Sequence, residues 1–357
     1  MTASLVGAAL VLTANGGLFG LLLGRNPRTA QLLSAFSLLA GSALGIAAAA
    51  SVLAGGAPWT AALPWSAVVG RVAVRLDALS AWFLVPVLAV PALGAVYGLR
   101  YHPQEEHGPR AARLQVLYGL VTAAMALVVL ADDGVLFLVA WEVMALSGFF
   151  LVLTDADQPE VRPAAYLFLA AAHASGFALA MAFSVVASER GTFAFAAWRG
   201  LDPHGARAAL VFVLLLVGFG LKAGLVPLHF WLPPAHAAAP SHVSALLSGV
   251  LIKTGLYGLL RVTGFFEAPP PAWGGAVLAV GAASAVLGVA YALAQHDLKR
   301  LLAFHSVENV GIIAMGAGLA LLAGQVGQRL EGTDNPLAGH PGETNPTAED
   351  EGRQGPA

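Results

Sequence analysis

Cysteine is absent from the 357-residue sequence. Without a thiol, the chain cannot form a disulfide, hold an iron–sulfur cluster through thiolates or attach haem covalently. Any redox chemistry linked to this protein must therefore take place in a partner.

Charged residues are also scarce. Asp, Glu, Lys and Arg make up 11% of the chain, whereas soluble domains average about 25%. The formal net charge of −2 leaves no excess of basic residues for binding nucleic acid. Hydrophobic residues make up 58% of the sequence, so we expect a polytopic membrane protein surrounded by the lipid bilayer.

Apolar runs of about 20 residues recur along the chain, and this is the length that an α-helix needs to cross a membrane. We predict an all-α polytopic fold with about ten transmembrane helices. The expected spans are 3–23, 30–54, 78–99, 114–131, 135–153, 163–187, 208–237, 241–264, 274–294 and 301–323. The first run has no basic segment before it, so we interpret it as a retained helix and not as a signal peptide.

The segments between the spans differ in character. Within the polar stretch 58–77, VAVRLDALS suits a short extended or amphipathic piece. The charged segment Arg100–Arg113 is expected to be a solvent loop, and Asp132–Gly134 a tight turn. The loop 189–207 carries three aromatic residues that suit a membrane interface, namely Phe193, Phe195 and Trp198.

Orientation and the C-terminal end follow from composition. Lys and Arg are slightly more frequent in loops after odd-numbered spans, so the positive-inside rule predicts an N-terminus outside the cytoplasm. From Gly327 to Ala357 the chain is rich in Gly, Pro, Glu, Asp and Thr. Such a segment cannot bury a core, and we expect this tail to be disordered.

Two lysines lie in segments that otherwise have the composition of lipid-embedded helices. Lys222 follows a long apolar run and precedes Pro227, and Lys253 lies in the eighth span. A lysine near the bilayer centre costs roughly 3 kcal/mol or more, so it rarely occurs there without a partner and a purpose. The alternative for Lys222 is a helix-end lysine that extends to the interface. The prolines and glycines beside it predict a helix interrupted at membrane depth.

Glu142 is an acidic residue that could serve these lysines. It lies mid-span in GVLFLVAWEVMALSGFF, with no other charge within eight residues on either side. It is either a buried acid that stays neutral or the partner of Lys222. Opposite charges about 4 Å apart gain roughly 4 kcal/mol at an effective dielectric constant of 20, which is comparable to the cost of burial. Making or breaking this contact could therefore switch Lys222 between its charged and neutral forms.

Lys253 belongs to a predicted polar track along the eighth span. His242, Gly249 and Lys253 are spaced by 7 and 4 residues, which places them on one face of a regular α-helix, with Tyr257 one turn further. A proton on Lys222 would repel one on Lys253. This repulsion would give an order to proton transfers.

Several histidines are candidates for a supporting relay. His173 shares a helical face with Tyr166, and it is either an interhelical hydrogen-bond donor or a relay. His305 and Glu308, near the start of the tenth span, either complete a relay or are ordinary polar residues at the start of a helix. Three further candidates lie in the proline-rich stretch, namely His229, His236 and His242. Their spacings of 7 and 6 are not typical of metal ligands, and we expect no metal.

Several motifs are similar to those of a known family. They are Trp141–Glu142, Lys222 in FGLKAGLVPLHFWLP, His236 in AHAAAP, Ser244–Leu247, Lys253 in IKTGLYG, and LKRLLAFHSVENVGII. Through them, residues 70–325 resemble the antiporter-like membrane subunits shared by respiratory complex I, multisubunit cation/proton antiporters and group 4 hydrogenases. PSHVSALLSG and FHSVENVGII resemble the large membrane subunit of hydrogenase 4 and formate hydrogenlyase more than the complex I branch.

The resemblance implies a function. The chain would be a proton-translocating membrane subunit of a hydrogenase- or complex-I-like oxidoreductase, in a bacterial-type cytoplasmic membrane. Glu142 and Lys222 would be the coupling pair and Lys253 the central relay. We expect no cofactor in this chain, because redox chemistry would lie in the other membrane and peripheral subunits. The alternatives are a component of a multisubunit Na⁺(K⁺)/H⁺ antiporter and an inert truncated paralogue.

The resemblance also implies an architecture, from which the chain departs in two places. The family has an inverted pair of five-helix repeats, each with one broken helix, and usually an acid where Pro234 stands. The first repeat is expected to be complete, but the second stops after two helices, so we expect a C-terminally truncated chain. The expected domains are N-terminal helices over 1–113, an antiporter-like unit over 114–325 and the tail over 326–357.

Overall fold

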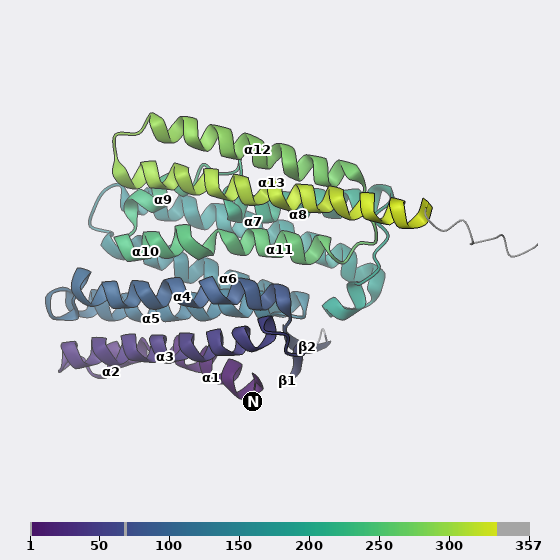
Figure 1. Cartoon of the computed structure of the whole chain (residues 1–357). Helices are drawn as coiled ribbons and strands as arrows, with labels where there is room; N and C mark the ends of the chain where they lie inside the picture. Colours follow the sequence, from purple (N-terminus) through teal and green to yellow (C-terminus); the bar gives the residue numbers. More distant parts are fainter. Residues whose placement is uncertain (1, 68–69, 334–357) are drawn as a thin grey trace, which may run out of the picture.

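The computed structural model describes the backbone of residues 2–67 and 70–333, and the side chains of residues 2–62 and 72–324. Within these residues, ten helices are long and apolar enough to cross a membrane. They run side by side along one direction and form an elongated bundle (Figure 1). The prediction of an all-α polytopic membrane protein is confirmed.

The elements follow the predicted spans closely. They are α1 (Thr2–Asn15), α2 (Leu18–Leu22), α3 (Pro27–Leu53), β1 (Trp59–Ala67), β2 (Gly70–Leu76), α4 (Ala78–Tyr101), α5 (Gln104–Leu130), α6 (Gly134–Val152), η1 (Leu153–Asp155), α7 (Val161–Arg190), η2 (Phe195–Trp198), α8 (Gly205–Ala223), α9 (Leu232–Ala238), α10 (Ser241–Leu246), η3 (Leu247–Leu251), α11 (Lys253–Thr263), α12 (Pro271–Leu293) and α13 (Leu298–Thr333).

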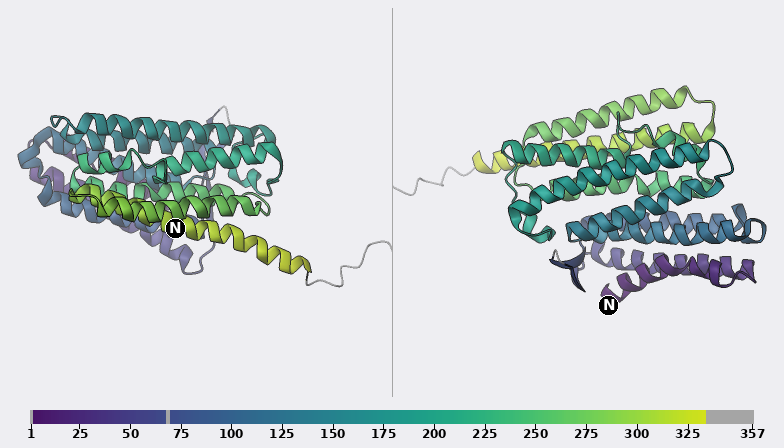
Figure 2. Two further views of the ribbon diagram at one scale, coloured as in Figure 1. Left: turned by 90° about the horizontal axis from the view of Figure 1, so that it is seen from above. Right: turned by 180° about the vertical axis from the view of Figure 1, so that it is seen from behind.

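The order of helices across the bundle follows the sequence. In Figure 1, α1–α3 form one side, α4 and α5 lie next to them, and α12 and α13 form the opposite side. The right-hand view of Figure 2 shows the same order from behind, and both views show the far end of α13 projecting beyond its neighbours. The middle of the bundle, from α6 to α11, therefore carries the interrupted helices, flanked on both sides.

The seventh span is interrupted as predicted. Helix α8 ends at Ala223, and Gly224 has a left-handed backbone with φ of 72° before the chain reaches α9. The backbone groups freed by the break are satisfied by protein, since Trp231 Nε1 donates to Leu221 O at 2.7 Å and Val226 N donates to Ser284 Oγ at 2.9 Å. Irregular backbone at membrane depth is tolerated under this condition.

The eighth span contains a π-helical turn that the sequence pattern did not predict. The turn covers Leu247–Leu251 and separates α10 from α11. One extra residue in a turn rotates everything after it by about 100° relative to a regular α-helix. The predicted single polar face is therefore wrong: His242 lies against α4 and α5, whereas Lys253 bonds back to Ser248 O in the π-helical turn.

A β-hairpin connects α3 to α4. Strand β1 pairs antiparallel with β2, from Trp59 opposite Leu76. The prediction of an extended piece is confirmed for VAVRL, while the following residues begin α4. The hairpin is tied to the bundle by Arg75, whose Nε lies 2.8 Å from Asp132 Oδ1 in the turn before α6. Asp133 caps α6 by accepting from Val135 N at 2.8 Å.

The prediction of a solvent loop over Arg100–Arg113 is wrong. Only two residues separate α4 from α5, and the first turns of α5 bend at Gly108, where φ is 49°. His102 and Gln104 are buried. Their backbone is held by Gln31 of α3, which donates to His102 O at 3.2 Å and accepts from Gln104 N at 3.0 Å. The Gln31 side chain thus makes the hydrogen bonds that water would make to the backbone of a solvent-exposed loop.

Two of the aromatic residues predicted for the membrane interface are buried inside the protein. Phe195 and Trp198 are 1% and 0% exposed, and Phe193 is partly buried. The rings of Phe195 and Trp198 pack on Phe183 of α7, at centroid distances of 5.9 and 5.2 Å. Aromatic rings gain more by filling a core than by contact with lipid headgroups when the loop folds back onto the helices.

The last described element is α13, and the predicted domain boundaries stay a prediction. Helix α13 extends to Thr333, beyond the predicted end of the bundle at residue 325. The rest of the predicted disordered tail, residues 334–357, lies outside the described residues.

Candidate functional site

Lys222 lies in the last turn of α8, directly before the break. It is 2% exposed, and its Nζ has no hydrogen-bond partner within the described part of the chain. The Nζ atom lies 5.2 Å from the ring centroid of Trp141 and 5.8 Å from that of Phe168. The rings therefore supply an electrostatic contact to the ammonium without taking a hydrogen bond. A snorkelling lysine would be exposed, so this alternative is wrong.

Glu142 follows Trp141 on α6 and is paired with a histidine. Its Oε2 lies 2.8 Å from His173 Nδ1 on α7, and the two side chains are 38% and 37% exposed. No ion pair joins Glu142 to Lys222 in the described residues. The predicted contact is thus open in this structure, and the carboxylate has a second partner available. Its role and that of His173 in a relay stay predictions.

Lys253 is the first residue of α11, immediately after the π-helical turn. Its Nζ donates a hydrogen bond to Ser248 O, inside that turn. A π-helical turn leaves backbone carbonyls without their regular partners, which explains why this acceptor is available. The Ser248 hydroxyl also lies 2.8 Å from the Ser306 hydroxyl of α13. Ser248 therefore links Lys253 to α13, because its carbonyl oxygen accepts from Lys253 and its hydroxyl contacts Ser306.

His236 lies on α9, the short helix after the break. It is 1% exposed, its Nδ1 lies 2.9 Å from Ser244 Oγ of α10, and its Nε2 has no partner in the described residues. Lys299 donates to Ala239 O at 2.9 Å, at the C-terminal end of α9, where helix carbonyls favour a cation. Sequence reasoning missed Lys299, because the expected tenth span began at residue 301 and left Lys299 in the loop before it, whereas α13 begins at Leu298.

The remaining predicted residues divide into separate groups. His305 and Glu308 of α13 pair with each other, with Nδ1 and Oε2 2.6 Å apart. His229 packs on Tyr291 and Phe304, at centroid distances of 6.2 Å each, and its Nδ1 has no partner in the described chain. In the described residues no hydrogen bond or ion pair joins these groups to Lys222 or Lys253, so their place in a relay stays a prediction.

Tyr257 belongs to a different cluster. Its hydroxyl donates to Val129 O of α5 at 2.7 Å and accepts from Arg261 Nε at 3.1 Å. Arg261 in turn forms an ion pair with Asp77, with Nη1 and Oδ2 2.6 Å apart. No pattern in the sequence indicates this pair, since its members are 184 residues apart. It fixes α11 against the beginning of α4.

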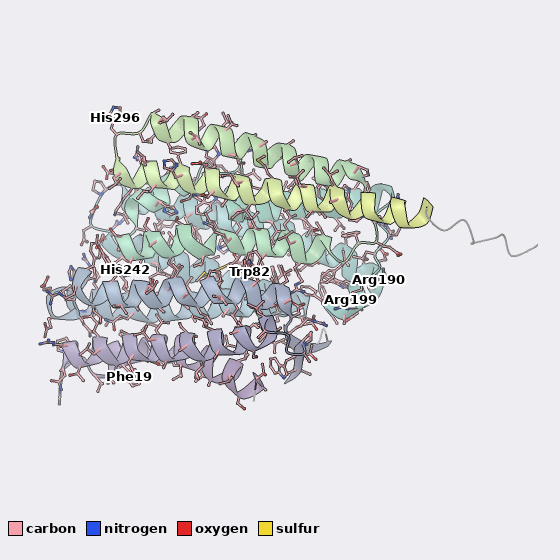
Figure 3. All side chains as sticks on the ribbon, in the orientation of Figure 1. Phe19, Trp82, Arg190, Arg199, His242 and His296 are labelled. Carbon is pink, nitrogen blue, oxygen red and sulfur yellow. The ribbon has the colours of Figure 1, made fainter. Side chains whose placement is uncertain are left out.

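His242 belongs to none of the clusters described so far. It lies near the end of the bundle that also carries His296 (Figure 3), and it is 4% exposed. Its nearest ring neighbours are Tyr118 and Tyr101, at 5.5 and 5.8 Å. Across the described residues, no group of three or more His, Asp or Glu side chains could hold a metal ion.

Comparison with known proteins places these residues in context. A family described as NADH:quinone oxidoreductase/Mrp antiporter, TM, matches residues 131–328. Hydrogenase-4 component B of Escherichia coli (strain K12) is 38% identical over 317 residues, covering 88% of this chain and 47% of the relative. Formate hydrogenlyase subunit 3 of the same organism is 33% identical, covering 72% of this chain and 40% of the relative. The resemblance expected from the motifs is confirmed.

A solved structure is similar as well. A chain in the structure of the Mrp complex from Dietzia sp. DQ12-45-1b superposes with a TM-score of 0.75 at 28% identity, over 89% of this chain and 34% of that one. The chain thus spans about half the length, or less, of the curated relatives and of this structural neighbour.

Proposed function

Because this chain belongs to the NADH:quinone oxidoreductase/Mrp antiporter family of membrane subunits, we propose that it translocates protons as part of a hydrogenase- or complex-I-like oxidoreductase. The observation that carries the proposal is Lys222, a fully enclosed amine beside a helix break with no hydrogen-bond partner in the described residues. Intramembrane lysines without a structural partner are typical of ion pathways.

The proposed relay uses Glu142, Lys222 and Lys253. Placing an ammonium group at membrane depth costs roughly 3 kcal/mol or more of free energy. Attraction to a carboxylate about 4 Å away offsets a similar amount. Glu142 is held at present by His173, so a rotamer change that exchanges His173 for Lys222 would load a proton onto Lys222. Releasing Glu142 back to His173 would favour release of that proton toward Lys253.

Redox chemistry is assigned to partner subunits. The chain has no cysteine with which to bind a cluster. The relatives named above are components of multisubunit enzymes by their names, and we propose that this chain likewise works with other membrane and peripheral subunits. We place it in a bacterial-type cytoplasmic membrane, with its N-terminus outside.

A second candidate is a component of a multisubunit Na⁺(K⁺)/H⁺ antiporter. It is supported by the structural similarity to a chain of an Mrp complex. A third is an inert paralogue. The three differ in a measurable way: redox-coupled and antiporter subunits both conduct protons, but only the antiporter responds to a Na⁺ or K⁺ gradient, and an inert chain does neither.

The test is proton uptake by liposomes that contain the full chain under an imposed membrane potential. Lys222→Met keeps the apolar bulk of the side chain and removes the amine. We expect it to lower uptake by about a hundredfold, the size typical of losing a proton-transfer group. Arg162→Gln, an exposed charge at the beginning of α7, is the matched control and should conduct as the wild type does.

Each outcome decides between the candidates. Uptake that is unaffected by Lys222→Met would refute the relay. Uptake driven by a Na⁺ gradient without any membrane potential would favour the antiporter. Absence of uptake by the wild type would favour the inert paralogue.

A further inference from the structure

A cavity with several polar groups in its lining lies between the N-terminal helices and the middle of the bundle, apart from Lys222. It is lined by residues of α3, α4, α5 and α10, among them Gln31, Gln115, Tyr118 and His242, and by His102 between α4 and α5. The centres of water molecules could occupy about 40 Å³ of space inside it. Since one water needs about 10–15 Å³ of such space, the cavity has room for about three.

Some of the polar atoms around this cavity have no protein partner in the described residues. Among the described residues, His102 Nδ1 and Nε2, Tyr118 OH, His242 Nδ1 and Gln115 Oε1 are buried without a hydrogen bond. His102, Tyr118 and His242 are 7%, 4% and 4% exposed. Leaving a buried polar group unsatisfied costs about 1–3 kcal/mol, so several together require a partner that the protein does not supply.

The geometry suits bridging water. The ring centroids of His242 and Tyr118 are 5.5 Å apart, and those of His242 and His102 are 6.5 Å apart. The polar atoms of these rings make no direct hydrogen bond within the described residues, and a water between neighbouring rings would satisfy both. Space for Tyr118 depends on Gly94 of α4, where an added Cβ would overlap the Tyr118 hydroxyl. A larger residue there would displace the Tyr118 hydroxyl.

The cavity is connected to the end of the bundle by a second histidine. His107, which is partly buried, stacks on His102 with centroids 3.8 Å apart. Burial lowers the pKa of His102, and the charge on His107 lowers it further, while Asp155 opposes these effects and Arg110 adds to them. A neutral imidazole with two unpartnered nitrogens can both accept and donate a proton.

We propose that this cavity is a hydrated proton-access chamber, in which water held by His102, Tyr118 and His242 carries protons from the α4–α5 end of the bundle to α10. In each transfer, chamber water gives a proton to one nitrogen of His242 and the opposite nitrogen releases one, so the ring returns to its neutral state. Helix α10 also carries Ser244, the hydrogen-bond partner of His236. The inference rests on the proposed proton translocation and adds a route by which protons reach the lysines.

A fixed cation is a poorer occupant. The lining residues include no Asp or Glu, and the unpartnered groups are neutral imidazoles, an amide and a phenol. Cations at membrane depth are bound by carboxylates or converging carbonyls. Water satisfies both the donors and the acceptors of this set.

The first arm of the test measures hydration. Hydroxyl radicals generated by X-rays from bound water label adjacent side chains, and the full chain in lipid nanodiscs is the sample. We expect Tyr118 to be labelled severalfold more than Tyr257, a matched tyrosine that is equally buried but bonded to protein. Ser34→Leu, which fills the cavity from α3, should abolish the labelling of Tyr118. Equal labelling of the two tyrosines would overturn the proposal.

The second arm measures proton uptake by the full chain in liposomes. His242→Phe keeps the ring volume and removes proton transfer, and we expect uptake to fall by about a hundredfold. Ser34→Leu should give a similar loss, whereas Ser188→Leu, at an exposed position on α7, should give none. Unchanged Tyr257 labelling shows that each variant keeps its fold.

The outcomes separate this inference from the proposed function. If Lys222→Met stops uptake while His242→Phe and Ser34→Leu conduct normally, the relay stands and the access chamber is refuted. If the wild type does not conduct, both proposals fail. If all three variants stop uptake and Tyr118 is labelled, both are supported.

Discussion

The carboxylate of Asp77 joins the beginning of α4 to the end of α11. Arg261 donates to Asp77 Oδ2 at 2.6 Å and Oδ1 at 2.7 Å, and the two side chains are 13% and 20% exposed. Asp77 also caps α4, since its Oδ1 accepts from Ser80 N at 2.9 Å. One carboxylate therefore serves a two-point ion pair and a helix cap.

The contribution of the Asp77 carboxylate to the free energy of unfolding follows from its pKa. Burial alone would raise this pKa, but the hydrogen bonds and charge of Arg261, together with Ser80, outweigh burial and lower it from 3.8 to about 2. A difference of this size corresponds to roughly 2 kcal/mol. Because the folded pKa is below the unfolded one, the contribution is fully present above about pH 4 and is lost as the pH falls through 2.

Asp77→Asn is the perturbation that isolates the charge. Asparagine caps a helix about as well as aspartate, so the cap survives while Arg261 loses its counter-charge. Removing one partner of a buried pair costs about 3–5 kcal/mol, and partial exposure places this case near the lower value. We expect a lower midpoint of thermal unfolding at pH 7, followed by tryptophan fluorescence of the full chain in detergent.

Two controls decide whether the reasoning holds. In an Arg261→Met background, Asp77→Asn should lower the free energy of unfolding only a little, because the charge that it removes no longer has a partner. The difference between wild type and Asp77→Asn should also shrink between pH 4 and pH 2. An equal cost in both backgrounds, or a difference that does not depend on pH, would refute the assignment of this stability to the ion pair.

Three further predictions concern packing around the site. Gly176→Ala would place a methyl group against Glu142 Oε1, so we expect slower proton uptake in liposomes with an unchanged unfolding midpoint, because only a flexible side chain must move. Gly311→Ala would place Cβ 2.5 Å from the backbone nitrogen of Ala285 on α12, and should destabilise the chain by about 1–3 kcal/mol in a thermal scan. Trp198→Ala would remove a fully buried ring, and should cost about 3–5 kcal/mol in the same assay.

Each of these has a matched control within the chain. Gly275→Ala and Gly316→Ala add a methyl group in open space and should leave both uptake and unfolding unchanged or slightly improved. Trp82→Ala removes a ring that is 68% exposed (Figure 3), and should cost far less than Trp198→Ala. Equal effects in a variant and its control would contradict the packing argument for that position.

Local properties determined what could be predicted. The ten spans follow from runs of apolar residues, since the length that crosses a membrane depends only on the run itself. The break after Lys222 follows from the glycines and prolines beside it. Glu142, Lys222 and Lys253 were found because an ionisable residue in an apolar run is costly wherever the helix lies. None of these inferences needs knowledge of a neighbouring helix.

Only the tertiary structure decided how these residues are paired. Glu142 contacts His173 instead of Lys222, because a carboxylate binds the donor that helix packing brings within about 3 Å. The π-helical turn separates Lys253 from the face of His242, and no residue pattern indicates such a turn.

The cavity at His242 shows the same limit. It brings together side chains that are far apart in the sequence, from the α4–α5 junction to α10, and only this arrangement leaves several of its polar groups without protein partners in the described residues. The sequence determines which residues lie in the membrane and the free-energy cost of placing each of them there. Docking of the helices decides which of them meet, because contacts between distant segments depend on the packing of the whole bundle.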